Sequence, residues 1–288
     1  IQESEQLGGT ALNYFIVKEL VKDKMGKVTG VMTIDSVSGE EIEIKGQVII
    51  NATGAWTDKI RNQIGKKPKL RLLRGSHLIF PRWRVPIPQA IALTHPSDGR
   101  PLYVFPWEGI TLFGTTDVDH KFSLEKEPKI TVNEGKYLLE AINYWFPSLS
   151  LTQKDVLSTF AGVRPVINTG KKDPSKESRE SAVWREKGMI TVTGGKLTTF
   201  GLLARRTLRE VKKQLTTTAQ AQKEISINKK KNEDFSQITN IDEWQIKRLF
   251  GRYGKNTFNL LKETGEKPFD RIENTDILWA ELIWATKN

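Results

Sequence analysis

Residues Thr193 to Thr199 read TGGKLTT and combine groups that suit an anionic or flat ligand. The two glycines let the backbone approach such a ligand closely. A helix that starts directly after them would add free N–H donors and a positive dipole end, and Lys196 would add a full charge. The same residues also fit a plain tight turn with Thr198 near the helix cap, so both interpretations stay open at this point.

A second group of small residues, Asn51-Ala52-Thr53-Gly54, ends an apolar, β-branched segment at 47–51. Small side chains at the end of a strand allow a phosphate or a ribose to pack against the backbone. Many strand-to-helix turns have this composition for structural reasons alone, so the signal is weak by itself.

Two side chains inside apolar segments could act on a hydroxyl group or an anion. His77 lies in the sequence RGSH, and an imidazole with an ordinary pKa of about 6.5 can accept a hydroxyl proton near neutral pH. Arg164 lies in AGVRP, where a buried guanidinium must find an anion or hydrogen-bond acceptors. A structural histidine and a structural ion pair are the alternative interpretations.

Metal and thiol chemistry are not predicted. The sequence has no cysteine and only three histidines, which argues against a disulfide, a thiolate metal site or a histidine-rich metal cluster. His95 and His120 are next to turn sequences, and we expect both at the surface. Asp117-Val118-Asp119 directly precedes His120 and is expected to form a solvated acidic loop.

The elements that must position these residues are mostly short strands. Alternating and β-branched segments are separated by Gly-, Ser- and Asp-rich turns, which is typical of an antiparallel or mixed sheet. We expect strands at 13–21, 28–35, 41–45, 47–51, 71–81, 90–93, 102–105, 110–115, 156–166, 182–184 and 189–192. We expect helices at 55–64, 132–146, 197–215, 242–250, 257–262 and 275–286. Two of these strands lead through a small-residue turn into a helix, which is where α/β sheets present ligands.

Composition sets wide limits. A length of 288 residues with 38% hydrophobic and 27% charged residues predicts a globular chain of one or two domains. The net charge of +11 could serve nucleic acid, an anionic membrane surface, an anionic small substrate or solubility alone. Because the basic residues are scattered among acidic ones, a nucleic-acid-binding module is the weaker alternative.

Five motifs stand in a specific order along the chain. They are NATGAW (51–56), LRLLRGSHLIFPR (70–82), GTTDVD (114–119), AGVRP (161–165) and TGGKLTT (193–199). Together they resemble the FAD-dependent glycerol-3-phosphate dehydrogenases, in the wider group that includes D-amino-acid and glycine oxidases. Glycerol-3-phosphate oxidases share the motifs but usually carry an insertion in the substrate region. The sequence shows no such insertion, which favours the dehydrogenases.

The resemblance implies an α/β (α+β) fold with an incomplete FAD-binding βαβ domain, a substrate domain on a mixed or antiparallel sheet, and a truncated helical C-terminal segment. It divides the chain into a partial FAD-binding domain (1–66), the substrate domain (67–158), a return to the FAD-binding domain (159–218), a linker (219–240) and a helical domain (241–288).

The resemblance also assigns roles to individual residues. His77, Arg164 and Lys196 would face the substrate, with His77 as the base and the two cations stabilising the phosphate and the alkoxide. The residues near the FAD would be Ala52, Thr53, Gly54, Gly194, Gly195, Leu197 and Thr198.

The implied reaction oxidises sn-glycerol 3-phosphate to dihydroxyacetone phosphate. The base takes the proton of the C2 hydroxyl, the hydride passes from C2 to flavin N5, and the electrons continue to a quinone. The implied location is cytoplasmic and peripheral at the cytoplasmic membrane, whose anionic surface the positive charge would suit. A flavin oxidase of the same superfamily that acts on an amine or an amino acid remains an alternative.

The sequence departs from the family pattern in one respect, because it contains no G-x-G-x-x-G fingerprint for the FAD pyrophosphate. The family carries that motif near its N-terminus, so we expect a fragment that lacks the N-terminal dinucleotide-binding segment. Such a chain should bind FAD poorly and be inactive or weakly active. Exposed sheet edges would also make self-association plausible.

Overall fold

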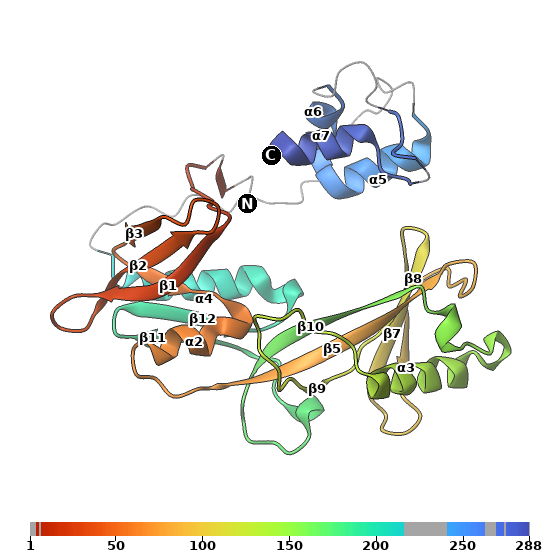
Figure 1. Ribbon diagram of the computed structural model, residues 1–288, viewed down its shortest axis with the longest axis horizontal. Coiled ribbons are helices and arrows are strands. Elements are labelled where there is room, and N and C mark those ends of the chain that lie inside the picture. The colour runs from red at the N-terminus through yellow and green to blue at the C-terminus, as the bar shows by residue number, and fades with distance from the viewer. Residues whose placement is uncertain (1–3, 6, 216–240, 263–268, 274, 288) are drawn as a thin grey trace. The chain divides into compact units, whose positions relative to one another are not determined.

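The computed structural model describes residues 4–5, 7–215, 241–262, 269–273 and 275–287. The chain divides into two compact units, one formed by residues 14–219 and the other by residues 1–13 with 220–288. The predicted linker at 219–240 lies outside the described residues. Within the larger unit, Figure 1 shows three sheets with helices packed against them.

The first sheet is an antiparallel meander of β1 (Phe15–Lys22), β2 (Val28–Asp35) and β3 (Glu41–Lys45). Side chains of β3 alternate between exposed and partly buried, and β2 has buried residues at Val28, Gly30 and Thr33, as expected for a sheet with one face on a core. Leu20 and Val28 are buried and pack with residues of the neighbouring βα unit.

The second sheet is antiparallel throughout and supplies the largest core. Its strand order is β10 (Ser158–Ile167), β5 (Leu70–Pro81), β8 (Ile110–Gly114), β7 (Pro101–Trp107) and β6 (Ile91–Thr94). A two-residue strand, β9 (Val118–Asp119), also pairs with β5. Helix α3 (Val132–Trp145) covers one face of this sheet (Figure 1), and Leu138 and Ile142 of the helix are buried there in one cluster with Leu78 and Phe80 of β5.

Helix α3 begins where its sequence provides a capping box. The Thr131 hydroxyl accepts from the Glu134 N–H, and the Glu134 carboxylate accepts from the Thr131 N–H. Three 3₁₀ turns, Pro147–Leu149, Gln153–Asp155 and Pro174–Lys176, lie in the loops on either side of β10.

The third sheet joins two distant parts of the chain. Its order is β11 (Ser181–Glu186), β12 (Met189–Gly194) and β4 (Ile49–Asn51), and β12 pairs with β4 in parallel. After β4 the chain forms a 3₁₀ turn (Gly54–Trp56) and α2 (Thr57–Asn62). After β12 it forms a 3₁₀ turn (Leu197–Thr199) and α4 (Phe200–Lys212). Because the two strands are parallel neighbours, both strand-to-helix turns lie at the same edge of the sheet.

A buried arginine fastens α2 to this sheet. Arg61 of α2 donates to both carboxylate oxygens of Glu186 on β11 at 2.9 and 3.0 Å and to Asp58 at 2.6 Å. Its guanidinium also lies 4.8 Å from the ring centroid of Trp184. Two carboxylates therefore compensate this buried cation and hold the helix against β11.

The regular structure described in the smaller unit is helical, apart from a bridge between Arg271 and Leu278. It contains α5 (Glu243–Tyr253), a 3₁₀ turn (Gly254–Asn256), α6 (Thr257–Lys262) and α7 (Trp279–Lys287). Its core consists of Leu249, Leu260, Leu278, Ala280 and Trp284. Throughout the described part of the chain, no helix has both the length and the apolar character needed to cross a bilayer.

The mixed α/β architecture expected from the sequence is confirmed, whereas some element boundaries were wrong. The expected helix 197–215 is interrupted, because the Thr199 hydroxyl bonds the backbone of Lys196 at 3.2 and 2.9 Å and stabilises a 3₁₀ turn before α4 begins. The expected helix 275–286 begins later, at Trp279, because Thr275 closes a turn onto Ile272. Strand β9 was not expected.

Candidate active site

Strands β5 and β10 bring His77 and Arg164 to the same face of the second sheet. Phe160 lies directly opposite His77, and directly opposite residues of an antiparallel pair project to one face. The imidazole stacks on the Phe160 ring with centroids 4.5 Å apart and an angle of 6° between the planes. Arg164 follows Phe160 by four residues on β10 and therefore projects to this same face.

A pair of glycines makes room between these two side chains. Gly75 and Gly162 lie opposite each other in the ladder. A Cβ atom at Gly75 would be 2.1 Å from Nη2 of Arg164, whereas a Cβ atom at Gly162 would meet nothing within 4 Å. The absence of a side chain at Gly75 thus lets the guanidinium of Arg164 lie across β5.

The His77 ring is held in a tight, largely apolar setting. A Cβ atom at Gly114 of β8 would be 2.4 Å from Cδ2 of the ring, so this glycine is also needed. Nδ1 is buried and has no hydrogen-bond partner among the described residues. Burial, and next the positive charge of Arg164, lower the pKa of His77 to about 4. His77 is therefore neutral at pH 7 and has a lone pair that can accept a proton.

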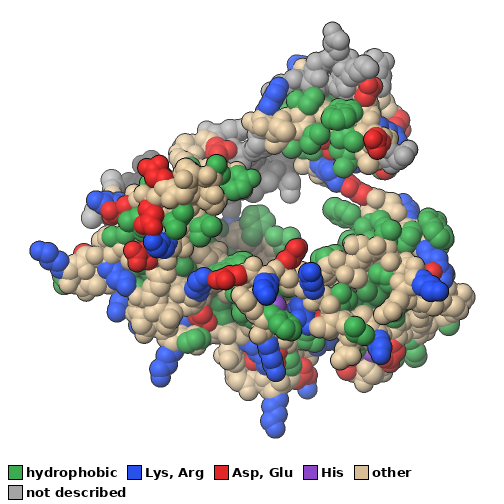
Figure 2. All heavy atoms as spheres, viewed as in Figure 1, with side chains coloured by type: hydrophobic (Ala, Val, Ile, Leu, Met, Phe, Trp, Pro, Cys, Tyr) green, Lys and Arg blue, Asp and Glu red, His purple; other side chains and the backbone are tan. Residues whose placement is uncertain are grey.

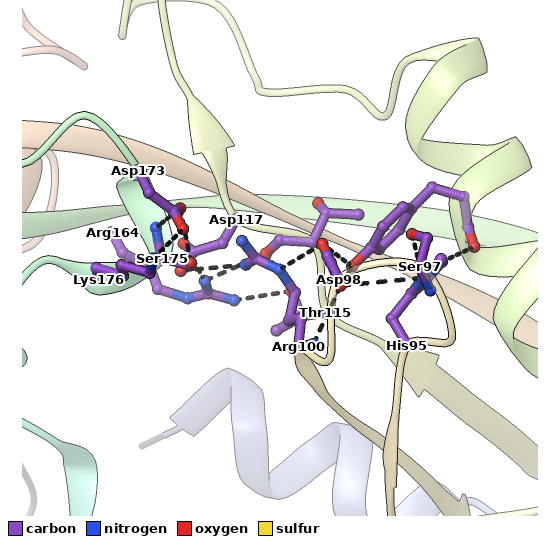
Figure 3. A network of polar contacts seen from close by, with 12 residues as sticks. His95, Ser97, Asp98, Arg100, Thr115, Asp117, Arg164, Asp173, Ser175 and Lys176 are labelled. Carbon is purple, nitrogen blue, oxygen red and sulfur yellow. Dashed lines mark hydrogen bonds and ion pairs between the residues drawn. The ribbon is translucent and has the colours of Figure 1, made fainter.

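Asp117 is the centre of a group of three arginines. Its carboxylate, which is only 3% exposed, lies 3.0 Å from Arg164 Nη1 and 3.4 Å from Arg100 Nη1, and it also contacts Arg179. Arg164 Nη2 donates to the Thr115 hydroxyl at 2.8 Å. Figure 3 shows the network around Arg164, Asp117 and Arg100. Asp117 alone against three guanidinium groups leaves a surplus of about two positive charges, of which the half-exposed Asp98, 4.0 Å from Arg100 Nε, offsets a part.

Two of these arginines open into a cavity of about 230 Å³. Arg164 and Arg179 line it together with Gly194 and Gly195 of the β12 turn. The side chains of Arg164 and Arg179 are 32% and 35% exposed, and both line the cavity, so they can still receive a ligand. Burial lowers the pKa of Arg164, Asp117 raises it, and repulsion from Arg179 and Arg100 lowers it further. A second anion in the cavity would relieve this repulsion.

The glycines of the TGGK turn are required by the chain's own packing. Gly194 and Gly195 have φ values of +73° and +82°. A Cβ atom at Gly194 would be 2.4 Å from the carbonyl oxygen of Glu180. The turn therefore packs on the segment that carries Arg179, and this brings the cavity's two walls together. Lys196 and Thr198 are exposed beyond the turn, and Leu197 is 90% exposed.

The Asn51–Gly54 turn lies beside the TGGK turn at the same sheet edge, since Asn51 pairs with Thr191 of β12. The buried side chain of Asn51 accepts from the Thr53 hydroxyl at 2.7 Å and donates to the Thr57 carbonyl at 3.2 Å. These bonds fix the turn and leave Ala52 exposed, with Gly54 at a φ of +58°. Small and glycine residues from both turns thus form one accessible edge, which fits a flat cofactor lying along it.

The other face of β5 carries a closed ion pair. Arg74 Nη2 donates to Glu134 of α3 at 2.7 Å, and both side chains are about 95% buried. Ser76, Thr116 and Thr131 donate to the same carboxylate at 2.7 to 2.8 Å. Burial opposes ionisation of Glu134, but these hydrogen bonds hold its pKa at about 2. This group has no surplus charge.

The surface placement predicted for His95 and His120 was wrong, because both are buried. The turn after His95 folds back on α3, where the ring stacks on Tyr137 and one ring nitrogen lies 2.9 Å from the Tyr137 carbonyl oxygen. His120 is drawn in by β9, and its N–H donates to the Leu72 carbonyl at 2.8 Å. The predicted solvated acidic loop was also wrong at Asp117, which the three arginines surround.

Arg179 was not singled out in the sequence, where it ends a Lys-rich loop at 168–179. Its position in the sequence does indicate that it lies near the Gly194–Gly195 turn. It stands two residues before β11, whose first residue, Ser181, pairs with Gly194. An arginine just outside a strand that pairs with a Gly-Gly turn must lie near that turn.

The face of residues 14–219 seen in Figure 2 has no single large patch of basic residues. On the face of residues 14–219 that Figure 2 presents, Lys and Arg side chains are distributed among Asp and Glu. Such mixing differs from the continuous basic stripe of a nucleic-acid-binding surface.

Known proteins match this chain over most of its length. A family model described as FAD dependent oxidoreductase matches residues 1–220. Aerobic glycerol-3-phosphate dehydrogenases of Bacillus subtilis and Staphylococcus epidermidis are 33% and 32% identical, over 95% and 99% of this chain. They are matched over 51% and 55% of their own length, so the chain spans about half the length of these relatives.

Solved structures of dehydrogenases are also similar to this chain. The glycerol-3-phosphate dehydrogenase of Bacillus halodurans, solved as a complex with FAD, is 35% identical with a TM-score of 0.67, over 75% of this chain and 42% of that one. The L-proline dehydrogenase of P. horikoshii has a TM-score of 0.52 at 18% identity, over 72% of this chain and 50% of that one, and shares the fold.

Proposed function

The chain belongs to the FAD-dependent oxidoreductase family, and from that premise we propose that it forms part of an enzyme that oxidises glycerol 3-phosphate to dihydroxyacetone phosphate. The observation that carries the proposal is the surplus of positive charge around Asp117, opening into a cavity beside the Gly194–Gly195 turn. A phosphate group suits this cavity because arginine forks bind phosphate oxygens in pairs. The names of the similar proteins point to the same substrate.

The residues of the site take distinct roles in this proposal. Arg164 and Arg179 bind the phosphate, and this fixes the rest of the substrate relative to the β5–β10 face. His77, neutral at pH 7, takes the proton of the C2 hydroxyl. The negative phosphate offsets the effect of Arg164 on the imidazole, so substrate binding itself makes His77 a stronger base. Lys196 adds positive charge beyond the turn, where an alkoxide develops.

FAD would lie along the edge formed by the two strand-to-helix turns, against Ala52, Thr53, Gly54, Gly194, Gly195, Leu197 and Thr198. When bound, it accepts the hydride that leaves C2. The positive φ values of Gly54, Gly194 and Gly195 and the large exposed side chain of Leu197 suit a flat ligand on this edge. We also propose a quinone as the electron acceptor, and with it a peripheral position at the cytoplasmic membrane, for which a net charge of +11 is favourable.

The first test measures substrate binding without depending on the flavin. Glycerol 3-phosphate should shift the NMR amide signals of Gly194 and Gly195, which line the cavity, whereas glycerol and glycine should not. An Arg164→Gln variant should abolish the shift, because it removes one fork from the phosphate. Equal responses to glycine, or a response that survives R164Q, would contradict the proposal.

The second test addresses the oxidation step. Because this chain is expected to bind FAD weakly, FAD is supplied in excess under anaerobic conditions, and glycerol 3-phosphate should then slowly bleach the visible absorbance of the flavin. His77→Gln should slow this bleaching by about 100-fold or more, the usual contribution of a general base, with little change in glycerol 3-phosphate affinity. An unchanged rate would remove His77 from the mechanism.

A further inference from the structure

We propose that Arg100 sets the anion affinity of the 230 Å³ cavity without contacting the anion, by sharing the carboxylate of Asp117. The proposal rests on the proposed function, because it takes the cavity beside Arg164 and Arg179 as the phosphate site. It adds a residue that lies outside the five sequence motifs. Arg100 immediately precedes β7 and is reached through the turn that follows His95.

The position of Arg100 is fixed from both directions along the chain. Its N–H donates to Asp98 Oδ1 at 3.0 Å, and its carbonyl accepts from the His95 N–H at 2.8 Å. His95 is itself anchored by stacking on Tyr137 of α3. The guanidinium, only 15% exposed, is thus presented to Asp117 by a turn that is packed on a helix.

Arg100 approaches Asp117 from a different side than the two cavity arginines. It lines a separate cavity of about 410 Å³, together with Asp98, Glu134 and Tyr137. The smaller cavity is lined instead by Arg164 and Arg179. In Figure 3, Arg100 extends between Asp98 and Asp117, with Arg164 beyond Asp117. An anion in the smaller cavity would therefore meet Arg164 and Arg179, with Asp117 between it and Arg100.

The sharing of one carboxylate explains how Arg100 acts at a distance. Oδ2 of Asp117 is within 3.4 Å of Arg100 and also contacts Arg179, while Oδ1 bonds Arg164. If Arg100 were neutral, the carboxylate would offset one of only two cations, and the surplus would fall from about two charges to about one. Arg164 already experiences this arrangement, because repulsion from Arg100 contributes to lowering its pKa.

Other charges near Arg100 weaken its influence but do not cancel it. Asp98 Oδ2 lies 4.0 Å from its Nε, is half exposed, and also accepts from the Tyr137 hydroxyl at 3.0 Å. Asp173 also interacts with Arg100 at longer range, and it pairs with Lys176 at 3.8 Å. Exposed and shared carboxylates of this kind are largely screened, whereas Asp117 is buried against Arg100.

The test titrates the 288-residue chain with inorganic phosphate at constant ionic strength and follows the amide signals of Gly194 and Gly195. Arg100→Gln should weaken phosphate binding by about threefold to tenfold, as expected for one charge removed at several ångströms in a screened site. Arg100→Lys keeps the charge and should stay within about twofold of the unaltered chain. A role in folding alone would not distinguish these two variants in this way.

A matched control comes from the same sheet. Arg84 pairs with Asp155 at 2.6 Å beyond the far end of β5, and Arg84→Gln removes the same charge from the chain. It should leave phosphate affinity within about twofold, since β5 runs eight residues from Leu73, the partner of Arg164, to Pro81. At about 3.3 Å per residue this span is about 26 Å, which exceeds the screening length of about 10 Å. Equal losses in R84Q and R100Q would mean that net charge alone matters and would overturn the proposal.

Two further outcomes are decisive. If R100Q does not fold, Asp98→Asn tests the role of Arg100 instead. This variant removes an exposed negative charge from the other side of Arg100, so it should tighten phosphate binding by about twofold. Unaltered affinity in the variants that fold would overturn the role of Arg100 while leaving the cavity intact as the anion site. Absence of any response in the unaltered chain, or a response insensitive to R164Q, would instead overturn the anion site itself.

Discussion

Two charge clusters of opposite design lie next to strand β5. On the α3 face, Arg74 and Glu134 are matched one to one, and three hydroxyl groups satisfy the remaining carboxylate lone pairs. In the second cluster, Asp117 meets three arginines, of which Arg164 lies across the other face of β5, and the side chains of Arg164 and Arg179 remain about one third exposed. The first cluster is complete in itself, and the second lacks a negative partner.

Neighbouring residues of one segment therefore belong to two clusters, one that stabilises the fold and one that is available to a ligand. Thr115 bonds Arg164 on one side, and the next residue, Thr116, bonds Glu134 on the other. The closed cluster holds β5, α3 and the 115–117 segment in place. The open cluster can then keep its arginines close together before a ligand arrives, so that less ordering is needed upon binding.

The largest loss of stability should follow from removing the negative charge of the closed cluster. Glu134→Gln leaves Arg74 buried without its carboxylate, and we expect a loss of about 3 to 5 kcal/mol in the free energy of unfolding. Chemical denaturation measures it. Phosphate should not restore the lost stability, since neither Arg74 nor Glu134 lines the anion cavity. A loss below about 1 kcal/mol would mean that the two clusters do not differ as described.

Asp117→Asn should have a smaller effect on stability. We expect a loss of about 2 kcal/mol, because Arg164 and Arg179 can regain water that Arg74 cannot. Phosphate should recover part of this loss by supplying the missing negative charge. Denaturation of D117N and E134Q with and without phosphate tests the contrast, and equal behaviour of both variants would break it.

The glycine pair on β5 and β10 offers a sharper comparison. Gly75→Ala would place Cβ 2.1 Å from Arg164 Nη2, so the guanidinium must move, at a cost of about 1 to 2 kcal/mol and with weaker phosphate binding. Gly162→Ala, directly opposite, has open space and should leave phosphate affinity unchanged. Similar phosphate affinities in both variants would show that Arg164 does not need to lie across β5.

The smallest effect at near-neutral pH lies in the pH dependence of stability. The pKa of His77 is lowered to about 4 in the folded state, so the unfolded chain binds the proton first as the pH falls from 6.5. Stability therefore declines between pH 6.5 and 4, by less than about 1 kcal/mol at pH 6. His77→Gln should reduce this slope but not abolish it, because the pKa of His120 is also lowered.

The closed cluster should respond in a different pH range. The pKa of Glu134 is lowered to about 2 from its ordinary value of 4.5, so its contribution is complete above pH 4.5 and is lost as the pH falls towards 2. Denaturation midpoints recorded from pH 8 to pH 3 would separate the two faces. A single transition near pH 4.5 that is insensitive to H77Q would contradict the assignment.

Local sequence predicted the sheets well where alternation was clear. Strands 28–35 and 41–45 were predicted with the bounds that the structure has, because a single buried face imposes period two. The two strand-to-helix turns were also predicted, and their positions on parallel neighbouring strands are now known. The roles assigned to His77, Arg164 and Lys196 remain predictions.

The arginine cluster could not be found in the same way. Arg100, Asp117 and Arg179 lie in three separate loops, and nothing in their neighbours shows that one carboxylate will collect three cations. The burial of His95 and His120 was missed for a related reason. A turn sequence determines backbone conformation, but packing against α3 or β5 decides whether that turn is exposed.

The parallel pairing of β4 with β12 has a consequence for biosynthesis. Ile49 and Met189 are paired although 140 positions separate them, whereas the antiparallel sheet that carries His77 draws its strands from residues 70–167. During synthesis on the ribosome, the sheet that carries the proposed base can form before β12 is available to pair with β4. The edge proposed for the cofactor therefore closes late, and until then β4 exposes unpaired backbone groups that chaperones or other chains can bind.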